Sequence, residues 1–287
     1  MIVLAALGMP WPLPYPFDRE YMQLALVAAV ALGMTAPLVG AFLVQKQLAL
    51  LGDGIGHVAL AGVGAGLWLN IAPLWIALIG AVCAALAIEW LRTRGRTPSD
   101  VALAVFFYGG IAAGVVLASR GGSTAALIPY LFGSILTVAP RDLWIVLGIA
   151  LGIASTIAVA GRALLAVIID PESSRVAGLP VNGLNAALAV LTATTVVAAM
   201  RIVGVLLIAA LMVLPVATSR RYARSFRRTL ITGAAIGGGA ALGGLTLARL
   251  FGLAAGGTIV LLVTALFLFT SIVSALRSPH RASPHEH

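Results

Sequence analysis

The residues best suited to chemistry are Asp53 and His57, which lie in an otherwise apolar stretch from Leu50 to Leu60. On a helix, their spacing of four residues puts both side chains on one face. Carboxylate and imidazole groups are both ligands of first-row divalent metals, so the pair is suited to hold such an ion. The alternative is that Asp53 caps the start of a helix and His57 makes a packing hydrogen bond. The two residues alone do not decide between these interpretations.

The rest of the chain is too apolar for a soluble fold. Of its 287 residues, 61% are hydrophobic and 9% are charged, whereas soluble domains carry about 25% charged residues. The mean hydropathy is +1.09. A single cysteine, Cys83, excludes an intrachain disulfide and a cysteine zinc cluster. We therefore interpret the chain as an integral membrane protein. An Asp at mid-bilayer costs about 2.5–3.5 kcal/mol and needs a cation, a partner or water.

The apolar runs predict how the chain crosses the membrane. About 20 apolar residues in a helix span the hydrocarbon core. The runs lack the alternation of strands, so we predict an all-α bundle of about nine transmembrane helices, with eight or ten as alternatives. The predicted spans are 22–44, 54–70, 74–91, 101–119, 143–161, 184–200, 203–218, 230–250 and 257–276.

These spans divide the chain into three parts. Residues 1–21 form an N-terminal segment, residues 22–276 a transmembrane domain, and residues 277–287 a tail. The tail contains three of the four histidines, His280, His285 and His287.

The basic residues predict the orientation of this domain. The net charge is +9, and all basic residues except Lys46 are arginines. Arginines cluster at 92–96 and at 220–228, and the positive-inside rule places both clusters in the cytoplasm. The N-terminal segment is then extracytoplasmic and the tail cytoplasmic. The loop at 162–183 lies inside and the loop at 120–142 outside.

The inside loop at 162–183 carries a second polar segment. Asp170 is suited to cap a short helix, Pro171 to its first position and Gly178 to its end. Such a helix is either a passive connection or a docking element for a partner. The chain contains no P-loop, zinc-protease or serine-hydrolase motif. If transport is driven by ATP, another subunit must hydrolyse it.

Five segments, in this order and spacing, resemble blocks of the ABC-3 family of metal-ion permeases, which includes zinc permeases of the ZnuB type and manganese permeases. They are Gly52–Gly62, Leu131–Leu136, Asp170–Pro180, Arg201–Thr218 and Ala255–Val260. The resemblance covers nearly all of residues 22–276. The chain departs from the family pattern between Asp53 and His57, where Gly54 and Gly56 replace an alanine and a serine.

The resemblance implies a permease domain with the fold of a type II ABC importer, in the bacterial plasma membrane. It implies that Asp53 and His57 are metal ligands on the transport path. The implied partners are a second copy of the chain, a cytoplasmic ATP-binding subunit that uses ATP, and an extracytoplasmic metal-binding protein. The residues implied to couple the ATPase are Asp170, Pro171, Glu172, Arg175, Gly178 and Leu179.

The same resemblance implies that the chain is not itself an enzyme and holds no permanent cofactor. Zinc is the expected cargo, with manganese or iron as alternatives. Three other functions compete. A secondary transporter would move its substrate without an ATPase, an intramembrane enzyme would need a nucleophile motif that the sequence lacks, and a structural subunit would tolerate the loss of Asp53.

Overall fold

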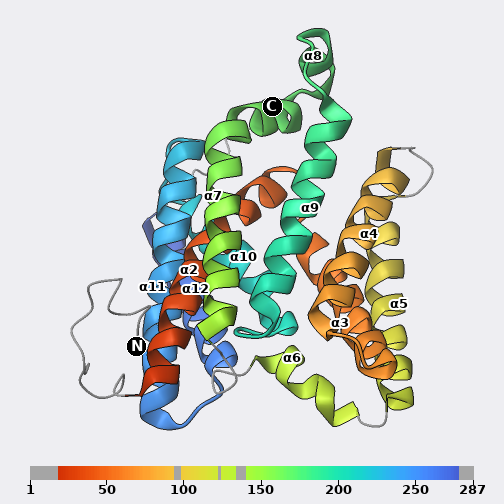
Figure 1. Cartoon of the computed structure of the whole chain (residues 1–287). Helices are drawn as coiled ribbons and strands as arrows, with labels where there is room; N and C mark the ends of the chain where they lie inside the picture. The colour runs from red at the N-terminus through yellow and green to blue at the C-terminus, as the bar shows by residue number, and fades with distance from the viewer. Residues whose placement is uncertain (1–18, 94–97, 122–123, 134–139, 278–287) are drawn as a thin grey trace, which may run out of the picture.

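The computed structural model describes residues 19–93, 98–121, 124–133 and 140–277, and within these ranges every regular element is a helix (Figure 1). Three elements are short: η1 (Thr124–Leu127), α6 (Ile128–Phe132) and α8 (Pro171–Val176). The long helices are α2 (Glu20–Gln45), α3 (Leu51–Leu69), α4 (Pro73–Thr93), α5 (Ser99–Arg120), α7 (Pro140–Ile169), α9 (Val181–Met200), α10 (Val205–Ser219), α11 (Phe226–Phe251) and α12 (Ala255–Arg277).

Each predicted span coincides with one long helix, so the prediction of a polytopic helical bundle is confirmed. Seven of these helices, all except α3 and α10, are long and apolar enough to cross a membrane. Helix α10 has only 15 residues, and α3 carries Asp53 and His57 in its first two turns. The exact number of nine crossings therefore stays a prediction.

The two ends of the bundle separate the loops that were assigned to opposite sides of the membrane, while the orientation itself stays a prediction. Figure 1 shows α8 and the C-terminal end of α4 at the upper end, and α6 at the lower end. The predicted cytoplasmic and extracytoplasmic loops thus lie at opposite ends of the molecule. The parts of the chain outside residues 22–276 fall mostly beyond the described residues, and so do the histidines of the tail and Ser134–Leu136 of the second family-like block.

Helix α9 connects two groups of helices. One group is formed by α2, α10, α11 and α12, and the other by α3, α4 and α5. Helix α9 contacts α2, α3, α4, α7 and α10, while α5 packs mainly on α3. A movement of α9 would therefore displace helices of both groups.

Glycines permit the closest helix contacts. A Cβ atom added to Gly237 on α11 would lie 2.1 Å from the carbonyl oxygen of Gly33 on α2, and one added to Gly62 on α3 would lie 2.6 Å from the Cα of Ala77 on α4. Helices that pack without a strong hydrophobic drive depend on such small-residue contacts. Gly62 and Gly237 therefore serve packing, whereas Gly239 has no atom within 4 Å of its Cβ position.

Three of the family-like segments meet at the end where α6 lies. Gly133 and Gly204 have φ angles of +75° and +94°, a region that L side chains rarely adopt. A Cβ on Gly133 would lie 2.3 Å from the Ile202 oxygen, and one on Gly256 would lie 2.3 Å from the Val203 oxygen. These segments therefore hold α6, the α9–α10 connection and the start of α12 together through their backbones.

A pair of substitutions on α11 tests the packing. We expect Gly237→Ala to lower the stability by about 1–3 kcal/mol, because the new Cβ overlaps the backbone of α2. Gly239→Ala, two residues away, is expected to be neutral or stabilising by up to about 1 kcal/mol, because its Cβ position is open. Thermal unfolding in detergent measures both, and equal melting temperatures for the two variants would contradict the close contact.

Candidate functional site

Helix α3, which carries Asp53 and His57, is enclosed by its neighbours. It packs against α5 and α4 on its own side and against α9 and α10 on the other. The helix is continuous from Leu51 to Leu69 despite its glycines. Gly56 is a tight contact, since a Cβ there would lie 3.1 Å from Val205 Cγ2. Gly56, one of the two residues that depart from the family pattern, thus lets α3 approach α10 closely.

His57 lies beside the middle of α5, one of the helices that can cross a membrane. A Cβ atom on Gly110 would lie 2.7 Å from the carbonyl carbon of His57. Gly110 is central in α5, which runs from Ser99 to Arg120 and is among the helices that can cross a membrane. His57 is therefore as far from either end of α5 as the helix allows, at the depth where an ionisable group is most costly.

The two candidate ligands face one another. His57 Nε2 lies 3.6 Å from Asp53 Oδ1, and the exposed fractions of the two side chains are 5% and 28%. The ring of Phe107 on α5 packs edge-on against the imidazole, with 4.5 Å between the ring centroids. Two ligands at about 2.1 Å from a tetrahedral metal are about 3.4 Å apart, so the pair needs little movement to share an ion.

The alternative role for Asp53 as a helix cap is wrong. The N-cap of α3 is Leu50, no side chain caps this helix, and Asp53 lies in its first turn. His57 makes no packing hydrogen bond through Nδ1, which is buried without a partner. Helix dipoles favour a negative charge in the first turn, which lowers the cost of an ionised Asp53.

The pair is an incomplete metal site by itself. Among the described residues, no group of three or more His, Cys, Asp or Glu side chains could hold a metal ion. A transition metal takes four or more ligands. The missing ligands must therefore come from water, from other residue types or from another chain.

The polar segment after α7 forms the helix that its sequence predicts. Asp170 caps α8 by accepting hydrogen bonds from the backbone N–H groups of Glu172 and Ser173 at 3.1 and 3.0 Å, and Pro171 occupies the first turn. The Ser173 hydroxyl also donates to Asp170, and these bonds lower the pKa of the carboxyl below its usual value. Gly178 follows with a φ angle of +81°, which ends the helix.

Helix α8 projects from the end of the bundle (Figure 1). The side chains of Glu172 and Arg175 are exposed, and Val176 is 91% exposed, while Leu179 is half-buried. Helix α8 thus presents charged and apolar side chains at this end of the bundle, and its role as a docking element stays a prediction.

A charged cluster around Lys46 lies close to the start of α3 and includes Glu89 and Asn185. The Lys46 ammonium, at the C-terminal cap of α2, lies 3.2 Å from Glu89 Oε2 and donates to Asn185 Oδ1 at 2.9 Å. Burial lowers the pKa of Lys46 to about 8, against the opposing effect of the Glu89 carboxylate. In the sequence, Lys46 stands out as the single lysine and Glu89 as an acidic residue near arginines at a span end, whereas nothing pointed to Asn185.

Comparisons with known proteins agree with the resemblance seen in the sequence. The manganese import system permease protein ScaB of Streptococcus gordonii is 32% identical over 90% of this chain and 92% of its own length. The manganese transport system membrane protein MntC of Halalkalibacterium halodurans is 32% identical over 89% of each chain. The solved structure of PsaBC from Streptococcus pneumoniae in complex with Fab includes a chain of 30% identity and TM-score 0.80, covering 94% of this chain and 95% of that one.

The sequence model of the ABC 3 transport family matches residues 18–274, which include every long helix except the last residues of α12. The match therefore spans both groups of helices, the Asp53–His57 pair and α8. This multi-pass membrane protein belongs to the ABC 3 transport family.

Proposed function

We propose that the protein is the membrane-spanning subunit of an ATP-binding cassette importer that moves a divalent transition metal ion, in the first place manganese, into the cytoplasm. The observation that carries this proposal is the pair of Asp53 and His57, which face each other in the first two turns of α3, with His57 beside the middle of α5. Asp53 caps no helix, and His57 Nδ1 is buried without a hydrogen-bond partner. Both are suited to bind a metal cation while it passes.

Manganese is favoured over zinc by the relatives. The expected preference for zinc rested on the Asp–His pair, which suits either ion. Two of the similar proteins are named for manganese, and zinc receives no comparable support. Zinc binds most sites of this kind more tightly than manganese, so selectivity for manganese would need geometry rather than affinity. Zinc stays the second candidate because the Asp–His donor set accommodates it.

The proposed assembly has four kinds of contact. A second copy of the chain completes the ligand set, because one chain supplies only two of the common ligands among its described residues. A cytoplasmic ATP-binding subunit docks on α8 and hydrolyses the ATP. An extracytoplasmic protein delivers the ion at the end where α6 lies. Lipid covers the outer surface, where large apolar side chains such as Val105 and Ile79 are exposed.

In the proposed cycle, the ion sheds water as it enters and binds Asp53 and His57 with modest affinity, so that it can leave again. ATP binding closes the partner subunits and pushes α8. The bundle then changes from outward-open to inward-open by near-rigid movements of helix groups. In this cycle, the energy for accumulation comes from ATP hydrolysis in the partner subunit, because binding at Asp53 and His57 supplies none over a full cycle.

The first prediction concerns the ligand pair. We expect Asp53→Asn and His57→Ala to lower metal uptake more than about tenfold, because each removes a ligand at the centre of the path. Asp100→Asn, which changes an exposed carboxylate in the first turn of α5, should leave uptake unchanged. Uptake of manganese by cells, with the amount of inserted protein measured in parallel, checks this. Normal uptake by both site variants would refute the assignment.

The second prediction concerns the ion. The complex reconstituted in liposomes with its ATP-binding subunit should accumulate Mn²⁺ when ATP is supplied. At equal free concentration, Mn²⁺ should lower the uptake of other divalent metal ions. Accumulation of Zn²⁺ without Mn²⁺ would reverse the order of the two candidates and leave the permease function intact. Uptake without ATP and without the partner would favour a secondary transporter instead.

The third prediction concerns α8. We expect Arg175→Glu to weaken co-purification with the ATP-binding subunit by about tenfold or more, because it reverses a charge on the exposed face of the proposed docking helix. Arg141→Glu makes the same change on an exposed residue at the opposite end of the bundle and should have no effect. Equal recovery of the partner with both variants would remove the docking role.

A further inference from the structure

The cluster around Lys46 joins three helices that are far apart in the sequence. Lys46 ends α2, Glu89 lies near the end of α4, and Asn185 lies near the start of α9. Besides its contact with Lys46, Glu89 accepts hydrogen bonds from Arg92 at 3.2 and 2.8 Å. The carboxylate is thus shared between two cations, while Asn185 is held by the Lys46 ammonium at 2.9 Å.

Two members of the cluster are largely buried. The exposed fractions of the Lys46 and Glu89 side chains are 9% and 10%. Buried ion pairs often add little net stability, because desolvation offsets the attraction between the charges. Their better-documented use is to select one arrangement of elements over another. This cluster therefore needs an explanation beyond stability.

One side of the cluster leads directly to α8. The chain leaves α8 through hydrogen-bonded turns: Leu179 N–H donates to Ser174 O at 3.0 Å, and Val181 N–H donates to Leu179 O at 2.9 Å. Helix α9 starts at Val181, so Asn185 lies about one turn into it. A displacement of α8 is thus passed to Asn185 without an intervening flexible linker.

The other side of the cluster leads to the metal ligands. Gln47 follows Lys46 with a φ angle of +61°, and the N–H groups of Gln47 and Leu48 close the end of α2 on Val44 and Leu43. A non-glycine residue in this conformation is held by its surroundings. Helix α3 begins at Leu51, and Asp53 follows two residues later. The Leu51 N–H in turn donates to Leu48 O at 3.0 Å, so we expect a shift of Lys46 to displace the first turn of α3.

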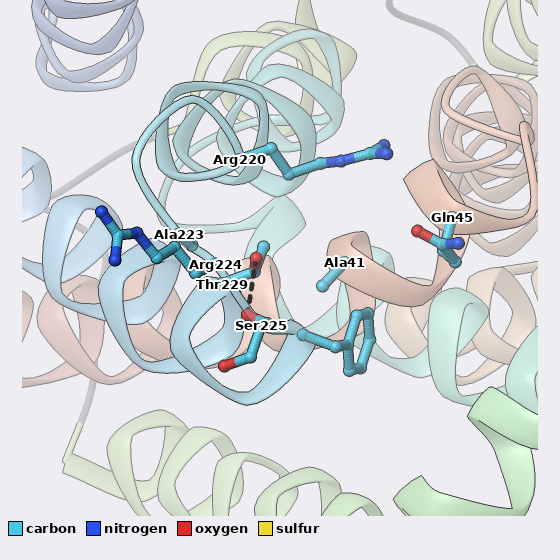
Figure 2. Close-up of a pocket in the computed structure, with 8 residues that line it drawn as sticks. Ala41, Gln45, Arg220, Ala223, Arg224, Ser225 and Thr229 are labelled. Carbon is cyan, nitrogen blue, oxygen red and sulfur yellow. Dashed lines mark hydrogen bonds between the residues drawn. The ribbon is translucent and has the colours of Figure 1, made fainter.

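The end of α2 has room to move. On the side of Gln45, it borders a cavity of about 300 Å³ that is also lined by Ala41, Phe226, Thr229 and Arg220. Figure 2 shows Arg220 extended across this space toward Gln45, with Ala41 below it. The neighbouring residue, Lys46, is held by the charged cluster. The end of α2 is thus bound to α4 and α9 through Lys46 and faces the cavity through Gln45.

We propose that Lys46 is a positioning residue, which through its bond to Asn185 carries the displacement of α8 and α9 to Asp53 and His57. In the present arrangement, Lys46 is bound to both Glu89 and Asn185. When the docked subunit moves α8, Asn185 shifts, and Lys46 either follows it or stays with Glu89. These are two discrete arrangements of one element, as coupling between distant sites requires. The inference rests on the proposed function, because it assigns α8 to the docked ATPase.

The test compares three variants in the complete complex with the ATP-binding subunit. Asn185→Leu removes the acceptor, and Lys46→Met removes the ammonium while Glu89 keeps its partner Arg92. We expect both to lower the number of metal ions moved per ATP hydrolysed at least about fivefold. Lys46→Arg, which keeps a charged donor, should restore most of that ratio. The ratio is informative because a fold defect would lower uptake and ATP hydrolysis together and leave it unchanged.

The matched control is Arg201→Met. Arg201 caps the other end of α9 and pairs with Asp142 on α7 at 2.9 Å, so the variant removes an ion pair of the same helix outside the proposed connection. It should keep the wild-type ratio. A wild-type ratio in Asn185→Leu and Lys46→Met, or an equal fall in Arg201→Met, would overturn the proposal.

A second measurement separates this inference from the proposed function. Spin labels at Leu50, the N-cap of α3, and at Ile231 on α11, with Cys83→Ser as background, report ATP-driven movement of the start of α3 without any metal. We expect the distance to change on ATP binding in the wild-type and Arg201→Met complexes and to stay constant in Asn185→Leu. The same change in Asn185→Leu would reject the inference, whereas an absence of metal uptake by the wild-type complex would reject the proposed function.

Discussion

The placement of a carboxylate and an imidazole inside an apolar helix bundle is the constraint on which much of this structure depends. His57 lies opposite the centre of α5, and Asp53, one turn earlier on α3, approaches it to 3.6 Å. A charge at that depth costs several kcal/mol unless a partner or a cation meets it. The chain reduces this cost by setting Asp53 in the first turn of α3, where the helix dipole favours a negative charge. It provides no third acidic, His or Cys ligand within the described residues.

Holding that pair in place requires close helix packing, and glycine provides it. Gly110 lets α5 approach the backbone of His57, and Gly62 lets α4 approach α3. A larger residue at either position would push the neighbouring helix away by about the size of a methyl group, because interiors are packed to crystal density. Four of the five family-like segments therefore divide into two kinds. The one around Asp53 contains the candidate metal ligands, while those around Gly133, Gly204 and Gly256 hold backbones together.

The site is positioned from one end by α2 and α9. Helix α9 contacts both groups of helices and runs directly on from α8, which projects from the bundle. Lys46 and Asn185 join α9 to the C-terminal end of α2, from which the chain turns into α3, through a partly buried hydrogen bond. Polar contacts of this kind are directional, so they fix one relative placement of the helices, whereas apolar contacts tolerate sliding. The arrangement thus gives a protruding helix a defined connection to the middle of the bundle.

Much of this could be predicted from the sequence because the governing forces are local. The apolar runs determined the helices, because a backbone in hydrocarbon must satisfy its own hydrogen bonds. Asp170, Pro171 and Gly178 determined α8, because caps act within one turn. The spacing of Asp53 and His57 determined that they share a face. Only the tertiary structure decided that Asp53 caps nothing, that His57 lies opposite the middle of α5, and that Lys46 meets Asn185 across 139 positions of sequence. These outcomes depend on how whole helices pack, and no short stretch of residues contains that information.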